Sequence, residues 1–143
     1  WHWRAFRVRD FDLISVIEEG SCGSDNSVHA MHDATEGGIL GAVWELAEAS
    51  GLGCVVLAEK IPVHRLTAKI CSILKLDPLR LIASGSMIMA TAEPEVLIAD
   101  LSARGITGTA IGNLVKIPGR KLLAGEKTTE LTPPGPDELY KIT

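Results

Sequence analysis

The stretch that decides the fold is VHAMHDATEGG, residues 28–38. Its first residues, 28–31, predict a short strand, and the apolar pattern after the two glycines predicts an amphipathic helix. We expect Asp33 or Thr35 to cap this helix, with Asp33 and Glu36 forming a capping box. Free N–H groups in a first helical turn carry the positive end of the helix dipole. The junction is therefore a candidate site for a phosphate or another anion.

Two adjacent glycines, Gly37 and Gly38, open the predicted helix. Each costs roughly 1 kcal/mol of helix propensity relative to alanine, so a compensating role is expected. Without a Cβ atom, the backbone here admits the close approach of either a bound ligand or a neighbouring strand. The residues alone leave both explanations open, because a glycine pair between a strand and a helix is a weak signal.

Outward from this junction, strands and helices alternate along the chain. Besides the motif helix, which Gly51 is expected to end, helices are predicted over residues 12–19, 62–74 and 94–103, with a turn-rich stretch at 20–27. Strands are predicted over residues 53–58, 79–83, 86–91, 108–117 and 121–124. This order predicts an α/β (α+β) fold, a layered domain in which helices cover a mixed β-sheet.

Two of the predicted helices carry apolar stripes at three- and four-residue spacing, which is typical of a face packed on a core. The stripe of the motif helix consists of Ile39, Leu40, Val43, Trp44, Leu46 and Ala47. The stripe of the helix over residues 62–74 consists of Val63, Leu66, Ile70, Ile73 and Leu74.

Three cysteines, Cys22, Cys54 and Cys71, form no C-x-x-C pair. An odd set of this kind argues against a disulfide framework and against a zinc site, so reduced thiols are expected. Cys54 in an apolar strand and Cys71 on an apolar helix face are predicted core residues. Cys22, in a Ser/Gly turn, is predicted to be exposed.

Length and composition indicate one soluble, cytoplasmic domain. The 143 residues leave room for a single core, and no apolar run approaches the ~20 residues needed to span a bilayer. A net charge of −4 gives no basic footprint for nucleic acid. We expect neither a membrane nor a nucleic acid as partner.

The first residues, 1–11, mix four aromatic side chains with three arginines. This composition is compatible with an arm that binds a membrane surface or a nucleic acid. It is equally that of a truncated amphipathic helix whose apolar side packs on another domain. The acidic net charge of the chain favours the truncated helix.

Two histidines, His29 and His32, lie three residues apart beside Asp33, which raises the question of a metal site. In a strand, His29 and His32 would point to opposite faces, with Asp33 on the side of His29. We therefore expect no metal here and interpret His32 as a polar group at the strand end. His64 is expected on the surface.

A second candidate site is the Ser-Gly-Ser turn at residues 84–86, between two predicted strands. Its N–H groups and hydroxyls could line a pocket beside the motif helix. A hairpin turn requires glycine for its backbone in any case, so a purely structural explanation stays open.

Residues 32–38, HDATEGG, followed by an apolar helix, resemble the C-terminal domain of the aminoimidazole ribonucleotide (AIR) synthase superfamily. The resemblance is closest to the branch of HypE-like hydrogenase maturation factors. Further stretches agree in order along the chain: LISVIEE at 13–19, AEKIPV at 58–63, LDPLRLIASG at 76–85 and PDELY at 136–140. The resemblance covers residues 11–143.

The resemblance implies half of an ATP-dependent enzyme. In this superfamily an N-terminal α/β half holds ATP and magnesium with glycine-rich and acidic segments, and this sequence contains nothing like them. Residues 1–20 are then the helical remnant of the link to that missing half, 21–132 the C-terminal domain, and 133–143 an extended tail. Such a chain is expected to be inactive without the N-terminal half.

The resemblance also implies roles for the candidate residues. The helix start would hold the phosphate or oxyanion of a small phosphorylated or carbamoyl-type substrate, with Asp33 and Thr35 as catalytic residues. The substrate- or phosphate-binding residues would be His32, Gly37, Gly38, Ser84, Gly85 and Ser86. Glu36 is the least expected contact, because its carboxylate would repel a phosphate.

A different class of function is a non-catalytic module for assembly. Homodimers are common in the superfamily, and an apolar face left exposed by the missing half is expected to find a partner. The sequence therefore leaves open whether the chain contributes to catalysis or only to assembly.

Overall fold

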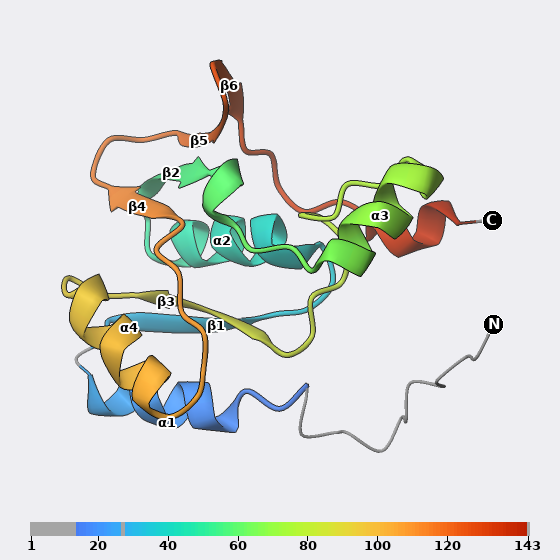
Figure 1. The fold of residues 1–143 in the computed structure, drawn as a ribbon. Coiled ribbons are helices and arrows are strands. Elements are labelled where there is room, and N and C mark those ends of the chain that lie inside the picture. Colours follow the sequence, from blue (N-terminus) through green and yellow to red (C-terminus); the bar gives the residue numbers. More distant parts are fainter. Residues whose placement is uncertain (1–13, 27, 143) are drawn as a thin grey trace, which may run out of the picture.

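A central helix between two sheets organises the computed structural model, which describes residues 14–26 and 28–142 (Figure 1). The helices are α1 (Ile17–Asp25), α2 (Gly38–Ala49), α3 (Arg65–Leu74) and α4 (Pro94–Ala103), with short 3₁₀ turns η2 (Ala58–Lys60) and η3 (Glu138–Lys141). The strands are β1 (Ala30–Ala34), β2 (Gly53–Leu57), β3 (Ser86–Ala90), β4 (Gly112–Val115), β5 (Arg120–Ala124) and β6 (Lys127–Glu130). The central helix is α2, and α1 and α4 lie beyond the β1–β3 sheet.

The larger sheet mixes parallel and antiparallel pairing. Its strand order is β4-β2-β5-β6, and only the β2–β5 pair is parallel. The smaller sheet is the antiparallel pair of β1 and β3, in which Ala34 lies opposite Ser86. The predicted layered α/β fold with mixed pairing is confirmed, although the strands form two sheets where we expected one.

The main core forms where α2 packs on β2. Fully buried Leu40 and Ala47 meet Cys54 and Val56 of β2, together with Leu131 from the segment after β6. The apolar stripe predicted for the motif helix is therefore confirmed, as is the burial of Cys54. The end of α2 also follows the prediction, since Gly51 has a positive φ of 64°.

The first helix lies further along the chain than expected, and residues 1–13 of the predicted segment 1–20 fall outside the described residues. The structure places α1 over Ile17–Asp25, so the helix overlaps the predicted one at residues 17–19 and continues through residues 20–25, where the sequence predicted a turn. The reason is tertiary packing, because Cys22 is fully buried against Leu97 and Leu101 of α4. Such packing overrides the weak helix propensity of Gly and Ser. The prediction that Cys22 is exposed was wrong.

Residues 79–83 form turns and bends rather than the predicted strand. The Asp77 carboxylate accepts a hydrogen bond from the Leu79 N–H at 2.9 Å, and the Asp77 carbonyl accepts one from the Arg80 N–H at 3.1 Å. The Leu79 carbonyl in turn accepts the Leu40 N–H of α2 at 3.1 Å. The backbone of residues 79–83 thus contacts the start of α2 and does not pair with β3. β3 pairs with β1 instead, so residues 84–86 are not the turn of a hairpin.

Two further strand predictions differ from the structure. β4 is confined to Gly112–Val115, although a strand was expected over residues 108–117. β6 was not predicted, because its four residues are polar and all exposed and so lack an apolar alternation. The predicted extended tail is irregular up to residue 137 and then ends in η3.

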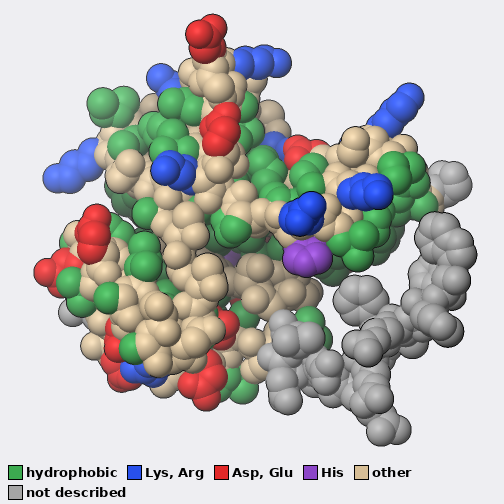
Figure 2. All heavy atoms as spheres, viewed as in Figure 1, with side chains coloured by type: hydrophobic (Ala, Val, Ile, Leu, Met, Phe, Trp, Pro, Cys, Tyr) green, Lys and Arg blue, Asp and Glu red, His purple; other side chains and the backbone are tan. Residues whose placement is uncertain are grey.

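Helix α3 is amphipathic, as predicted, but its apolar stripe faces outward. Among its residues only Cys71 is buried, and Ile73 is 70% exposed. The other exposed apolar residues of the stripe are Leu66, Ile70 and Leu74. Figure 2 shows apolar side chains gathered on this side of the molecule. The expectation that the stripe packs on the core was wrong for this helix.

Across the described part of the chain, no helix is both long enough and apolar enough to cross a membrane.

Candidate functional site

The candidate site begins where β1 ends, with the two polar residues His32 and Asp33 at successive positions of the strand. The His32 side chain lies on the α2 side, where its Nε2 is 2.8 Å from a carboxylate oxygen of Glu45. Asp33 is exposed, and it lies opposite Met87, whose Cε approaches Gly20 of α1. The side chains of His32 and Asp33 stay close to each other, with Nδ1 of His32 3.8 Å from Oδ1 of Asp33.

The turn between β1 and α2 is built from backbone rather than from side-chain caps. The N-cap residue of α2 is Gly37, in the left-handed region at φ 79°, and no side chain of its own accepts a hydrogen bond there. The Thr35 carbonyl accepts the N–H of Gly38 at 3.2 Å and that of Ala83 at 3.3 Å. The predicted caps, Asp33 and Thr35 with a capping box to Glu36, were wrong.

The two glycines are required by neighbouring segments of the same chain. Gly38 has φ 63°, and a Cβ there would lie 2.6 Å from the carbonyl oxygens of both Leu79 and Leu81. A Cβ on Gly37 would lie 3.1 Å from the Cβ of Pro134 in the C-terminal segment. Of the two explanations left open by the sequence, close approach of the chain itself accounts for both positions.

The anion at the start of α2 is a carboxylate from the end of the chain. Asp137 is 2% exposed, and its Oδ2 accepts the Gly37 N–H at 2.8 Å across 100 residues of sequence. Its Oδ1 accepts the Leu139 N–H at 2.9 Å. The sequence analysis missed this residue. Its local signal was an Asp directly before Glu-Leu-Tyr, a capping pattern for the short turn that follows.

Three other N–H groups at the start of α2, those of Gly38, Leu40 and Gly41, also have internal acceptors. Gly38 donates to Thr35, Leu40 donates to the Leu79 carbonyl, and Gly41 donates to the Gly37 carbonyl at 3.0 Å. A bound phosphate would compete with these partners. Among these four N–H groups, that of Gly37 is the one whose acceptor is a side chain, the Asp137 carboxylate.

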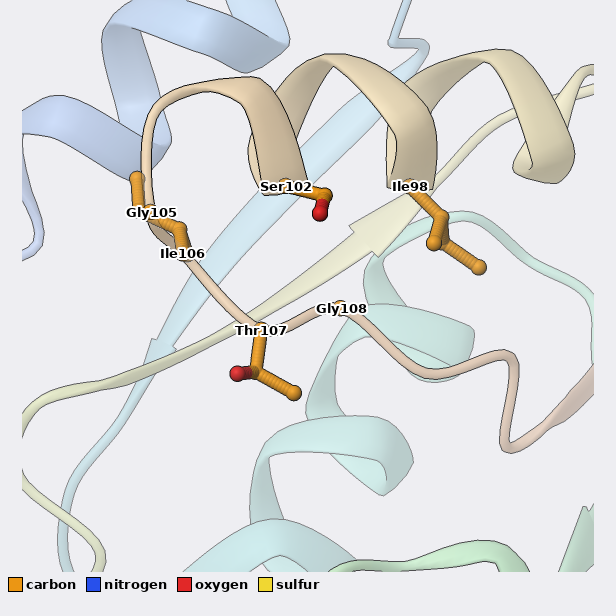
Figure 3. Close-up of a pocket in the computed structure, with 6 residues that line it drawn as sticks. All are labelled: Ile98, Ser102, Gly105, Ile106, Thr107 and Gly108. Carbon is orange, nitrogen blue, oxygen red and sulfur yellow. The ribbon is translucent and has the colours of Figure 1, made fainter.

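The pairing of β1 with β3 brings the two candidate segments together. Ser86 is the register partner of Ala34, and the Ala83 N–H bonds to the Thr35 carbonyl. Residues 84–86 therefore lie beside the β1–α2 turn, as the sequence analysis expected. They do not enclose a deep pocket there. A cavity of about 250 Å³ lies elsewhere, between α4 and residues 105–108, where Ser102 and Thr107 expose their hydroxyls (Figure 3).

Two side chains of the C-terminal segment, those of Glu138 and Tyr140, form hydrogen bonds with residues near the β1–α2 turn. The pKa of Glu138 lies below its usual value because the Lys141 ammonium donates a hydrogen bond to it and the Asp77 N–H donates another. The Tyr140 hydroxyl donates to Glu36 at 3.0 Å, and that hydrogen bond raises the pKa of Tyr140. Glu36 thus contacts the chain's own tail.

The cysteines lack the features of reactive thiols. Cys22 is buried beside Asp100, and burial is the main cause of its raised pKa. Burial likewise raises the pKa of Cys54. Within residues 14–26 and 28–142, no group of three or more His, Cys, Asp or Glu side chains is arranged to hold a metal ion.

Residues 8–123 match the family described as AIR synthase related protein, C-terminal domain. The chain belongs to this family. It is similar to the carbamoyl dehydratase HypE of Bradyrhizobium diazoefficiens, with 36% identity over 93 residues that cover 64% of this chain and 25% of that protein. The resemblance expected from the HDATEGG segment is confirmed.

Solved structures of HypE share the fold. The structure of HypE from Escherichia coli, a hydrogenase maturation protein, aligns with a TM-score of 0.77 and 26% identity over 90% of this chain and 42% of that one. A HypE structure in complex with ATP aligns with a TM-score of 0.67 and 26% identity over 74% of this chain and 36% of that one. The chain therefore spans less than half the length of these HypE relatives.

Proposed function

We propose that the chain is the C-terminal domain of an ATP-dependent, HypE-like enzyme of the cytoplasm. We further propose that the β1–α2 turn, together with residues 84–86, forms its substrate-side surface, the surface that contacts the substrate. The observation that carries this proposal is the pairing of β1 with β3, which sets residues 84–86 beside residues 35–38. The substrate would be a small phosphorylated or carbamoyl-type compound. Its oxyanion would bind the Gly37 N–H and the hydroxyls of Ser84 and Ser86.

The remaining candidate residues take roles at the edges of this surface. Thr35 is exposed in the turn and would contact the substrate through its hydroxyl, and Gly38 would hold the turn in shape. Asp33 would be a catalytic residue for a substrate that reaches the exposed end of β1. His32 would bind the substrate, with its ring oriented by the Glu45 carboxylate. Hydrogen-bond donors that point at the negative charge developing in a transition state stabilise it strongly. Among the candidate groups, the Gly37 N–H would contribute most to such stabilisation.

The residues that the structure describes offer no evident site for ATP and magnesium. The described residues gather no group of three or more metal-binding side chains, and the N–H groups of Gly37, Gly38 and Leu40 at the start of α2 have internal acceptors. We therefore assign ATP and magnesium to a separate N-terminal half, as the resemblance to the AIR synthase superfamily implies. On this proposal the chain is inactive without that half.

A titration of the chain with pyrophosphate, followed by amide NMR, tests the substrate-side surface. We expect saturable shifts of the amides of residues 35–38 and 84–86. Ser84→Ala should raise the dissociation constant about three- to tenfold, because one neutral hydrogen bond is lost. Ser102→Ala, at the cavity beside α4, is the matched control and should leave binding unchanged. The proposal fails if no saturable shift appears at millimolar pyrophosphate, or if the shifts lie only around Ser102.

The exposed stripe of α3 favours the second candidate function, assembly. We propose that this stripe mediates self-association of two copies of the chain, since exposed contiguous apolar surface marks interaction sites. Ile73→Glu should raise the dissociation constant of the dimer at least about tenfold, because it places a charge in the contact. Sedimentation velocity measures this change.

The matched control for this experiment is Ala68→Glu, which adds the same charge at an exposed position of the same helix, on the side away from the stripe. It should leave the dimer nearly unchanged. A wild-type chain that stays monomeric at high concentration would rule out self-association through α3.

A further inference from the structure

The C-terminal segment lies across the start of α2. After β6, buried Leu131 fixes the chain in the core, and the Thr132 hydroxyl accepts a hydrogen bond from the Arg80 side chain at 3.2 Å. Pro134 then contacts Gly37 and Gly41. Figure 1 shows the segment running from β6 past the end of α2 where that helix begins, toward η3. The segment therefore covers the turn that the proposed substrate would contact.

Asp137 is a buried carboxylate with no cationic partner. Both of its oxygens accept backbone N–H groups, from Gly37 and Leu139. No Lys, Arg or His nitrogen among the described residues lies within 4.0 Å of it, as an ion pair would require. The carboxylate is therefore stabilised by backbone dipoles at a helix start, which is how proteins also hold free anions.

The side chains that follow Asp137 make contacts that are more exposed. Tyr140 is exposed, and its hydroxyl bond to Glu36 joins two side chains at the surface. Glu138 is buried, but its contact with the Asp77 N–H is 3.1 Å long and its partner Lys141 is mostly exposed. Release of Asp137 from Gly37 would therefore leave few buried contacts to retain residues 138–141.

We propose that residues 133–141 form an autoinhibitory latch, in which the Asp137 carboxylate occupies the oxyanion position at the Gly37 N–H until a substrate oxyanion displaces it. This inference rests on the proposed function, because the displacing anion is the substrate-side group proposed above. The latch adds a cost to binding, since the anion must compete with a tethered carboxylate. Displacement would free residues 138–141 and uncover the turn.

Pyrophosphate binding to Asp137→Asn tests the latch, because asparagine keeps the size of the side chain and removes its charge. We expect Asp137→Asn to bind pyrophosphate about tenfold or more tightly than wild type, since a charged hydrogen-bond partner no longer competes. In the wild-type chain, saturation with pyrophosphate should raise the backbone mobility of residues 138–141, measured by heteronuclear NOE. Glu126→Gln, the same charge change at an exposed site, should bind like wild type.

Tyr140→Phe is a second variant that removes the surface tie to Glu36 and leaves Asp137 and the core intact. It should give an intermediate gain in affinity. Equal affinity of wild type and Asp137→Asn, with the tail immobile at saturation, would overturn the latch and leave the anion surface standing. Absence of binding to both chains would overturn the anion surface and the latch together.

Discussion

Replacing Gly38 by alanine is expected to lower the free energy of unfolding by about 3 kcal/mol or more. The left-handed φ of 63° costs a residue with a side chain roughly 1–2 kcal/mol. The added Cβ would also lie 2.6 Å from two backbone carbonyl oxygens of residues 79 and 81, which cannot move aside as a flexible side chain could. Overpacking of this kind typically costs a further 1–3 kcal/mol or so. Urea unfolding followed by circular dichroism measures the change.

Gly51→Ala is the matched control for this prediction. Gly51 has nearly the same φ, 64°, but a Cβ there would meet no atom within 4 Å. It should therefore cost only the backbone term of roughly 1–2 kcal/mol. Equal losses for the two variants would mean that the close approach of residues 79–81 to Gly38 does not occur in solution.

Replacing Leu131 by alanine is expected to lower the free energy of unfolding by about 2–5 kcal/mol. Leu131 is 1% exposed and belongs to the core cluster that joins α2 to β2. Its loss would leave a cavity beside Leu40 and Val56 that surrounding side chains fill only in part. Thermal unfolding by differential scanning calorimetry measures the loss.

Leu139→Ala provides the comparison for a leucine of the same C-terminal segment. Leu139 is 47% exposed, so its truncation should cost no more than about 1 kcal/mol. If the two leucines had similar effects, the segment after β6 would not be anchored in the core as the structure places it.

The parts of the fold that the sequence predicted well are those whose signals are local. α2 has a clear apolar period, β2 is a short continuous apolar run, and α4 is marked by Pro94 at its start, as α2 is by Gly51 after its end. Periodicity together with a terminator is enough to place an element, because neighbouring side chains then decide its conformation.

The parts that the sequence did not predict depend on distant partners. α1 forms through Gly and Ser because Cys22 packs on α4, about which residues 17–25 carry no local information. Residues 79–83 have the composition of a strand, but their backbone is engaged by the start of α2. α3 shows that an apolar stripe predicts a helix without saying what covers it.

The sequence placed the candidate site at the β1–α2 turn and residues 84–86. The structure brings these two segments together, and their role in binding is the proposal made above. From the sequence we predicted an anion at this helix start and expected it to be either a bound ligand or the side chain of a nearby capping residue. The structure provides Asp137 from the opposite end of the chain. Its proposed role as a competitor follows from that contact and from no motif near Gly37.

The bond between Gly37 and Asp137 also constrains the order in which the domain can be completed during synthesis. The two residues are 100 positions apart, so the helix that organises the core emerges from the ribosome long before its terminal partner. Contacts of such separation are slow to form and leave apolar surface uncovered meanwhile. A nascent chain that stalls before Leu131 would have α2 but neither the last core side chain nor the carboxylate at its start. Such an unfinished chain would therefore expose apolar core surface of the kind that chaperones bind.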